Sequence, residues 1–485
     1  MKTLFWVFLA LLLATFYHRG NHYDEAWLAE QAYWLLQDGV VRSELFRGLN
    51  GWENQLFVFH KLFIYLSAGW QALFGFSLVA GKSFSLVGTT LGGLLLRGYL
   101  RQQGIGRRFV WLGLLLYVSS RFVIEFSFVY RPEATCAALG FASFWLLTNS
   151  RWAWAALLAG LAALTHLNGL CFVLAGGGFL LWTRQPWQAT GFGILAGLTT
   201  SFYLLDVLTS ANWATFLMQV QNDPARWQLQ SMADKIWLTG QTAWFTGLNY
   251  ELSLLVGTAY LLNRHDRPAS QPISRYLLLV TGGYLGLSRG YAAQYVLLLV
   301  PFVCAFTALQ IAGWQPAARP VWAVWGWKLA LSIYLLTGFA KAAASIRFNL
   351  TTPGVAQLNA DMASLIRAPG QKVLAPLHFF YGQMGHYQVR GIDRHVTNFF
   401  KFNPQSQLTN QQLFTMAERE GFAAVITYDG KGPAAPLTDT RPLTDSLNQL
   451  GTYRRVYQDR WNSLYLASGQ TCVEENVRLS STLGR

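Results

Sequence analysis

Ionisable and polar side chains gather in a few short segments of an otherwise apolar chain, and they are the first candidates for chemistry. Carboxylates can take a proton from an attacking group, and Lys and Arg can hold a phosphate. Charged groups near membrane depth are costly, so their clustering favours a functional site. The segments contain Asp24 and Glu25; His60 and Lys61; Arg131 and Glu133, preceded by Arg121 and Glu125; His166 and Asn168; and Arg289, Tyr291 and Tyr295.

The composition places these segments in a membrane protein. Of the 485 residues, 53% are hydrophobic and only 12% are charged, whereas a soluble globular protein carries about 25% charged residues. Charge at half that level cannot cover a water-facing surface of this size. The sequence therefore predicts an α-helical polytopic membrane protein, much of whose surface contacts lipid.

Apolar runs predict about eleven membrane-spanning helices, since a helix needs about 20 apolar residues to cross a bilayer. The first run is interpreted as a membrane anchor rather than a cleaved signal peptide, because no small-x-small cleavage site follows it. The predicted spans are 3–17, 81–99, 109–126, 134–149, 153–166, 169–183, 188–208, 242–262, 276–288, 294–312 and 321–341.

Loop charges predict the orientation of these spans. The loop 100–108 (LRQQGIGRR) and later short loops on the same side are basic, and basic loops remain in the cytoplasm. We therefore expect a multi-pass protein of the cell (inner) membrane with a cytoplasmic N-terminus. The five polar segments then all lie at the outer boundary of the membrane.

Two domains are expected. Residues 1–341 form the transmembrane domain, whose long first outer loop, 18–80, contains an amphipathic stretch (DEAWLAEQAYWLLQDG) and an apolar stretch at 56–74. Both stretches predict helices in the membrane interface. Residues 342–485 have the composition of a soluble domain, which we expect on the outer face.

Strands and helices alternate in the C-terminal region, which predicts a small α/β domain. The strands are expected at QKVLAP, FAAVITY, TYRRVYQ and WNSLYLA. The helices are expected at 353–367, 409–420 and 439–449, the second of them capped by Thr409 or Asn410.

Two other compositional features exclude common classes of site. The net charge of +14 comes from loops that follow the positive-inside pattern, and no nucleic-acid-binding motif accompanies it. Some basic residues could instead bind anionic lipid headgroups. The four Cys residues have no ligand-like spacing, so we expect neither a zinc site nor a disulfide framework.

The order of the polar segments resembles that of the GT-C superfamily, glycosyltransferases that use polyprenyl-phosphate sugars. An Asp-Glu pair follows the first span, then an interfacial helix, a His-Lys pair and the turn FVYRPEATC. Within the superfamily the chain is similar to protein O-mannosyltransferases and to the aminoarabinose transferase of lipid A. The run ALFGFSLVAGKSFSLVGTTLGGLLLRGYLRQQG is also similar to the family's segment that leads into the second span. The resemblance covers residues 1–310.

The resemblance implies a catalytic role for three carboxylates. Transfer from a lipid-linked sugar phosphate needs a base that takes the proton of the acceptor hydroxyl, and Asp24 matches the family's base. Glu25 is a further candidate, and Glu133 matches the second acidic position. The alternatives are structural: Asp24 as a helix N-cap, Glu25 as a solvated first-turn carboxylate, and Glu133 as the ion-pair partner of Arg131 or Arg121.

The resemblance also implies the groups that bind the donor. Lys61 and Arg289 match the residues that contact the phosphate, and Arg131 is a further phosphate-binding candidate; snorkelling to lipid headgroups is the alternative for Lys61 and Arg289. The same turns supply Tyr291, Tyr295 and His166 as substrate-binding candidates, although His166 could simply cap a helix end.

A divalent metal ion is the one cofactor that the resemblance suggests, and no organic cofactor is expected. His60 stands where relatives place an acidic residue or a His that could bind a metal, although a hydrogen-bonded interfacial His is the alternative. Relatives often carry two prolines after this position, whereas this chain has Leu62 and Phe63. This departure weakens the case for a metal at His60.

The function expected is an inverting glycosyltransferase that moves a sugar from a polyprenyl-phosphate donor to a lipid, glycan or protein acceptor on the outer face. The main alternative is a transporter or flippase of lipid-linked glycans. Such a protein would place charges in mid-membrane on broken helices, often in two related halves, and the predicted spans show neither feature. A structural scaffold would leave the loop carboxylates without a role.

Overall fold

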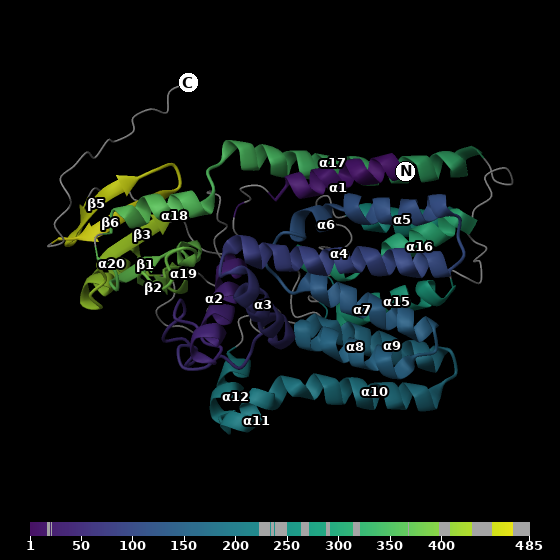
Figure 1. Ribbon diagram of the computed structural model, residues 1–485, viewed down its shortest axis with the longest axis horizontal. Helices are drawn as coiled ribbons and strands as arrows, with labels where there is room; N and C mark the ends of the chain where they lie inside the picture. The colour runs from purple at the N-terminus through teal and green to yellow at the C-terminus, as the bar shows by residue number, and fades with distance from the viewer. Residues whose placement is uncertain are drawn as a thin grey trace.

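The computed structural model describes residues 1–16, 20, 22–222, 233, 237, 250–262, 271–287, 292–313, 321–366, 368–396, 408–428 and 449–468. Long helices lie side by side in one layered bundle, and a small sheet domain projects from one end of it (Figure 1). The N-terminus lies near the opposite end of the bundle.

The bundle is built from apolar helices that correspond to the predicted spans. They are α1 (Lys2–Ala14), α4 (Leu78–Gln102), α5 (Arg107–Ser119), α6 (Arg121–Phe126), α7 (Glu133–Thr148), α8 (Trp152–Thr165), α9 (Leu170–Trp182), α10 (Pro186–Ser201), α11 (Leu205–Ser210), α14 (Tyr250–Leu262), α15 (Gln271–Leu287), α16 (Val300–Gly313) and α17 (Val321–Thr351). Residues 242–249 of one predicted span lie outside the described residues.

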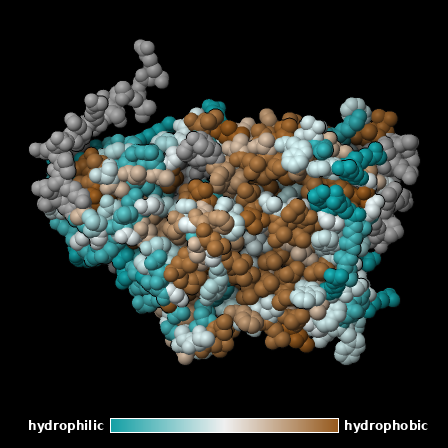
Figure 2. Space-filling model, in the orientation of Figure 1, coloured by the Kyte–Doolittle hydropathy of each residue, from teal (hydrophilic) through white to brown (hydrophobic). Residues whose placement is uncertain are grey.

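Among the described residues, three helices are long and apolar enough to cross a membrane by themselves: Leu78–Gln102, Pro186–Ser210 and the helix that begins at Val321. Shorter apolar helices, among them α1, α7, α8 and α16, pack beside them. In the space-filling view, hydrophobic side chains form a broad area over the middle of the bundle, and hydrophilic ones gather toward both ends (Figure 2). This distribution is typical of a helical domain embedded in a membrane.

Small residues allow the helices to approach closely, as in other membrane bundles. Gly338 on α17 is the clearest case, because a Cβ there would lie 1.8 Å from the carbonyl oxygen of Ser119 at the end of α5. Large aromatic rings fill the spaces elsewhere: Phe144, Tyr276 and Phe302 contact one another with centroids 4.7–5.8 Å apart.

The first long loop (residues 18–80) folds into the two predicted helices, α2 (Tyr23–Asp38) and α3 (Lys61–Phe74). α2 ends at Asp38 and is followed by Gly39, whose φ of +72° suits glycine. The N-cap of α2 is His22, whose ring accepts the backbone N–H of Asp24, while the Glu25 carboxylate accepts the backbone N–H of His22 at 2.6 Å. The structural role suggested for Asp24 as the N-cap is therefore wrong.

The C-terminal domain contains a six-stranded mixed sheet in the order β2-β1-β3-β6-β5-β4. β1 pairs in parallel with β2 and β3, whereas the pairs β3–β6, β6–β5 and β5–β4 are antiparallel. Its elements are α18 (Val355–Ser364), β1 (Lys372–Ala375), the 3₁₀ helix η8 (Leu377–Phe380), β2 (Gln388–Gly391), α19 (Asp393–Val396), α20 (Asn410–Arg419), β3 (Ala424–Tyr428), β4 (Gln449–Leu450), β5 (Tyr453–Gln458) and β6 (Asn462–Ala467).

Four predicted strands match β1, β3, β5 and β6, and α20 opens with the predicted Thr409 cap. β2 and β4 are additional strands. The helix expected at 439–449 lies outside the described residues except for Gln449, which belongs to β4. The expected domain boundary after residue 341 falls inside α17, which continues to Thr351.

One hydrophobic core joins the first long loop to the C-terminal domain. It combines α2 and α3 side chains such as Leu28 and Phe63 with sheet-domain side chains such as Val373 and Phe380. The C-terminal domain is therefore packed directly on the loop that carries the first polar segments, as the position of α2 beside it also shows (Figure 1).

Candidate active site

Asp24 and Glu133 meet on the two sides of a single arginine. Arg131 Nη1 contacts the Asp24 carboxylate. Its Nη2 and Nε lie 2.7 and 3.0 Å from Oε1 of Glu133. Arg131 and Glu133 are buried, and 16% of the Asp24 side chain is exposed. Asp24 is thus the carboxylate of this group that solvent or a substrate can reach.

Short local structures hold these side chains in place. Asp24 is the second residue of α2, and Glu133 is the first residue of α7. The backbone N–H of Arg131 donates to Ser85 of α4 at 3.2 Å, which ties the turn between α6 and α7 to the bundle. The first turns of two helices and one hydrogen-bonded turn thus hold the three side chains together.

His166 lies against Glu133. Its Nε2 is 3.9 Å from Oε1 of Glu133, and its Nδ1 accepts the backbone N–H of Asn168 at 3.0 Å. That hydrogen bond places the proton of a neutral ring on Nε2, toward Glu133. His166 therefore both caps the end of α8 and directs its Nε2 toward the Glu133 carboxylate.

Two further predicted residues contact the ring of His166. The ring of His60 stacks on it with centroids 4.7 Å apart, and the ring of Tyr295 meets it at 5.1 Å. His60 precedes α3, and Tyr295 belongs to the 3₁₀ helix η6 (Ala293–Leu298). The structure thus brings together six of the predicted site residues: Asp24, Arg131, Glu133, His166, His60 and Tyr295.

Glu25 points away from Asp24 into the scaffold. Its Oε1 accepts the backbone N–H of Tyr130 at 2.8 Å, and its Oε2 accepts that of His22. Lys82 Nζ lies 3.6 Å from Oε2. Glu25 is fully buried. A carboxylate with both oxygens so occupied fixes the turn that carries Arg131 rather than reaching a substrate.

Lys61 begins α3 directly after His60 and forms an ion pair with Asp206 of α11. Its ammonium also lies 3.9 Å from the centroid of the Phe59 ring. Burial lowers the pKa of Lys61 to about 8, although Asp206 opposes the shift. Arg289 and Tyr291 lie outside the described residues.

Three contacts of the site were not predicted. In the sequence, Lys82 and Asp206 are single charged residues within apolar segments, in or beside predicted spans. A charged residue in such a position is itself a signal of function. Tyr381 of the C-terminal domain donates to the backbone carbonyl of Glu25 at 2.7 Å. Nothing in its sequence neighbourhood distinguishes it, because only the packing of the C-terminal domain on α2 creates the contact.

The three Cys residues described are buried and free. Within the described parts of the chain, no three His, Cys, Asp or Glu side chains form a group that could hold a metal ion. The stacked rings of His60 and His166 do not by themselves supply such a group.

Comparison with known proteins identifies the fold. No family model matches the chain, and no curated protein is similar to it in sequence. The crystal structure of ArnT from Cupriavidus metallidurans bound to undecaprenyl phosphate has a TM-score of 0.63 at 14% identity, over 96% of this chain and 97% of that chain. ArnT in the apo state gives a TM-score of 0.58 at 13% identity over the same shares.

The arabinosyltransferase EmbB from Mycobacterium smegmatis is a more distant neighbour, with a TM-score of 0.44 at 14% identity over 66% of this chain and 31% of that chain. The likeness to ArnT covers both the helical bundle and the C-terminal domain. At this level of identity the likeness shows the fold alone: this chain has the fold of ArnT over nearly its whole length.

Proposed function

We propose that this chain is an inverting glycosyltransferase that moves a sugar from a polyprenyl-phosphate donor to an acceptor hydroxyl at the membrane surface. The observation that carries the proposal is the Asp24 carboxylate, partly exposed and held by Arg131. Asp24 belongs to α2, which lies at the end of the helical bundle beside the C-terminal domain. Its support is the fold shared with ArnT, which was solved bound to undecaprenyl phosphate.

The proposed reaction is a single displacement. The acceptor oxygen bonds to the anomeric carbon, and the bond from that carbon to the phosphate oxygen breaks with its electron pair. Asp24 takes the proton that the acceptor loses, and the polyprenyl phosphate leaves as an anion. The phosphate is already a weak base, so it needs cations rather than an acid.

Arg131 has a positioning role in this scheme. Its guanidinium lies between Asp24 and Glu133 and fixes the direction of the Asp24 carboxylate. Glu133 is the second carboxylate on Arg131, and His166 Nε2 lies 3.9 Å from the same Oε1 atom that Arg131 contacts. A displacement with a positively charged transition state needs correct placement of the base more than strong basicity.

Lys61 is the donor-phosphate residue that we propose among the described residues. It is adjacent in sequence to His60. The His60 ring stacks on that of His166, whose Nε2 lies 3.9 Å from the Glu133 carboxylate. Asp206 holds the ammonium in the structure. A phosphate would compete with Asp206 for it as a point charge. No step of this reaction is assigned to a metal ion.

The bundle end that carries the site is proposed to face outward. Arg107 begins α5, and Arg151 and Arg184 stand in the turns before α8 and α10. These three helices begin at the bundle end away from the C-terminal domain (Figure 1). The positive-inside rule then places that end in the cytoplasm.

The proposal is tested with the purified full chain in nanodiscs, supplied with a polyprenyl-phosphate-sugar fraction and with membrane lipids as acceptors. Mass spectrometry should show loss of the sugar donor and release of polyprenyl phosphate. The Asp24→Asn variant should lower this turnover by about 100-fold or more, while it still binds undecaprenyl phosphate. His22 rather than Asp24 caps α2, so the substitution leaves the helix start intact.

Two outcomes would contradict the proposal. Binding of the lipid donor without any turnover in the wild-type protein would fit a transporter. Turnover of Asp24→Asn at the wild-type rate would remove Asp24 from the reaction and leave Glu133 as the remaining carboxylate of the group.

A further inference from the structure

The C-terminal domain contacts the base-bearing helix through the phenol of Tyr381. This residue follows η8, is 5% exposed, and donates to the carbonyl oxygen of Glu25 at 2.7 Å. A backbone carbonyl has two lone pairs, so this bond adds to the hydrogen bonding of the helix itself. The bond reaches the residue next to Asp24.

The Glu25 side chain in turn contacts the turn that carries Arg131 and Glu133. Its side chain accepts the N–H of Tyr130, the residue before Arg131, and lies beside Lys82 of α4. One fully buried residue thus joins three parts of the molecule: the C-terminal domain through its carbonyl, the 130–133 turn and α4 through its carboxylate.

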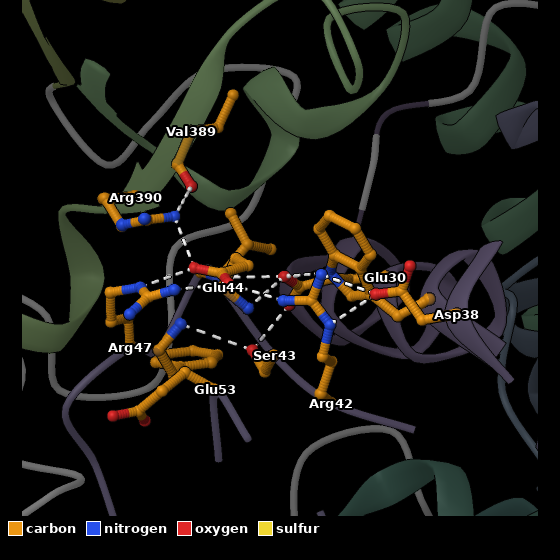
Figure 3. Close-up of polar contacts among 12 residues, drawn as sticks. Glu30, Asp38, Arg42, Ser43, Glu44, Arg47, Glu53, Val389 and Arg390 are labelled. Atoms are coloured by element: carbon orange, nitrogen blue, oxygen red, sulfur yellow. Dashed lines mark hydrogen bonds and ion pairs between the residues drawn. The ribbon is translucent and has the colours of Figure 1, made fainter. Parts of the chain in front are cut away.

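A second contact holds α2 farther along its length (Figure 3). Arg390 of β2 donates to Glu44 at 2.7 Å, and the N–H of Gly391 donates to the carbonyl of Leu45 at 2.8 Å. The same loop is held to α2 because Glu30 accepts the N–H groups of Glu44 and Leu45 at 2.5 and 2.9 Å. The C-terminal domain therefore fixes α2 at two levels, near residues 25 and 30.

We propose that Tyr381 is a positioning residue, through which the C-terminal domain sets the placement of Asp24 against Arg131. The inference rests on the proposed function, because it assumes that Asp24 is the base. It gives the C-terminal domain a part in catalysis although none of its residues touches the reacting atoms. A helix held at both levels cannot rotate Asp24 away from Arg131, and small displacements of a base are costly in rate.

The test compares two tyrosines of the same domain in the full chain. Tyr381→Phe removes only the bond to Glu25, whereas Tyr387→Phe removes bonds to Ala363 and Ile366 inside the C-terminal domain. We expect Tyr381→Phe to lower kcat about five- to tenfold, the effect of one hydrogen bond on placement. KM for the donor and the thermal unfolding midpoint should stay near their wild-type values. Tyr387→Phe should leave kcat unchanged.

A double-variant comparison separates positioning from a general loss of structure. If Tyr381 acts through Asp24, Tyr381→Phe should not lower the residual turnover of Asp24→Asn any further. Arg390→Gln weakens the second contact and should also lower kcat at constant KM, which provides a second variant if Tyr381→Phe folds poorly.

Equal effects of Tyr381→Phe and Tyr387→Phe, or equal fractional losses in the presence and absence of Asp24, would overturn the inference. These results are distinct from failure of the proposed function. That failure would appear as full activity of Asp24→Asn itself, whatever the tyrosine variants do.

Discussion

At the scale of single residues, the contacts of each ionisable group separate candidates that look alike in the sequence. Asp24 and Glu25 are adjacent acids, yet Asp24 contacts Arg131 and is partly exposed, while Glu25 is buried with both oxygens occupied. Successive residues of a helix point about 100° apart, so one of two adjacent side chains can face the substrate while the other faces the scaffold. This geometry favours Asp24 as the base.

Lys61 allows a prediction about donor binding. A charge-assisted hydrogen bond contributes about 1.5–3 kcal/mol, which corresponds to about 10- to 100-fold in affinity. We therefore expect Lys61→Met to raise the Kd for undecaprenyl phosphate by about that factor, measured by titration of the protein in detergent. Lys372→Met is the matched control, because Lys372 is exposed on the C-terminal domain and donates only to the Glu420 carbonyl among the bonds described. Equal Kd values for both variants would exclude Lys61 from the phosphate site.

At the scale of elements, α2 depends on a buried carboxyl that does not take part in the proposed reaction. Glu30 accepts hydrogen bonds from Ser43, Trp34 and the N–H groups of Glu44 and Leu45. Burial raises the pKa of Glu30 from its ordinary value of 4.5 to about 7, despite these bonds, which favour the ionised form. The folded protein therefore binds a proton there more tightly than the unfolded chain does.

The pH dependence of stability follows from this shift. The contribution of Glu30 is fully present below pH 4.5 and is lost as the pH rises through about 7. At about 1.4 kcal/mol for each unit of pKa, the loss is at most about 3 kcal/mol. Glu30→Gln imitates the protonated group, since its amide can donate to the Ser43 hydroxyl, and it should abolish this loss.

The measurement is the thermal unfolding midpoint between pH 4 and 8 in detergent. Wild-type protein and Glu418→Gln, a substitution of an exposed carboxylate on α20, should both become less stable relative to Glu30→Gln as the pH rises. A constant difference between Glu30→Gln and wild type over this range would show that the Glu30 pKa is not raised.

At the scale of the whole molecule, the bundle has two unlike ends. The C-terminal domain and α2, the helix that carries Asp24, lie at one end, and the N-terminus lies near the other (Figure 1). We predict that these ends face opposite sides of the membrane. Green fluorescent protein fused before Met1 should fluoresce, and alkaline phosphatase fused after Arg485 should be active, because each reporter works on only one side of a bacterial inner membrane. Exchanging the two reporters should abolish both signals, and activity of the exchanged pair instead would invert the proposed orientation.

The sequence by itself determined those features that depend on neighbouring residues. Apolar runs predicted the helices of the bundle, alternation predicted the strands β1, β3, β5 and β6, and Thr409 was recognised as a cap. The edge strands β2 and β4 were not predicted; they have four and two residues, and each pairs with a single neighbouring strand. His22 was missed as the cap of α2, since an imidazole ring is an unusual acceptor at that position.

Only the tertiary structure decided which charged groups meet. The segments with Asp24, Arg131 and His166 were predicted to lie on one side of the membrane, but a spacing along the chain does not fix which side chains touch. Their contacts arise from the packing of α2, α7 and α8, and the pairs of Lys61 with Asp206 and of Lys82 with Glu25 arise in the same way. The bond from Tyr381 to Glu25 joins residues that are far apart in the sequence, and it depends on the packing of the sheet domain on α2. Pairing of buried charges requires atoms to meet within about 4 Å, and such distances follow from the packing of whole elements rather than from local sequence.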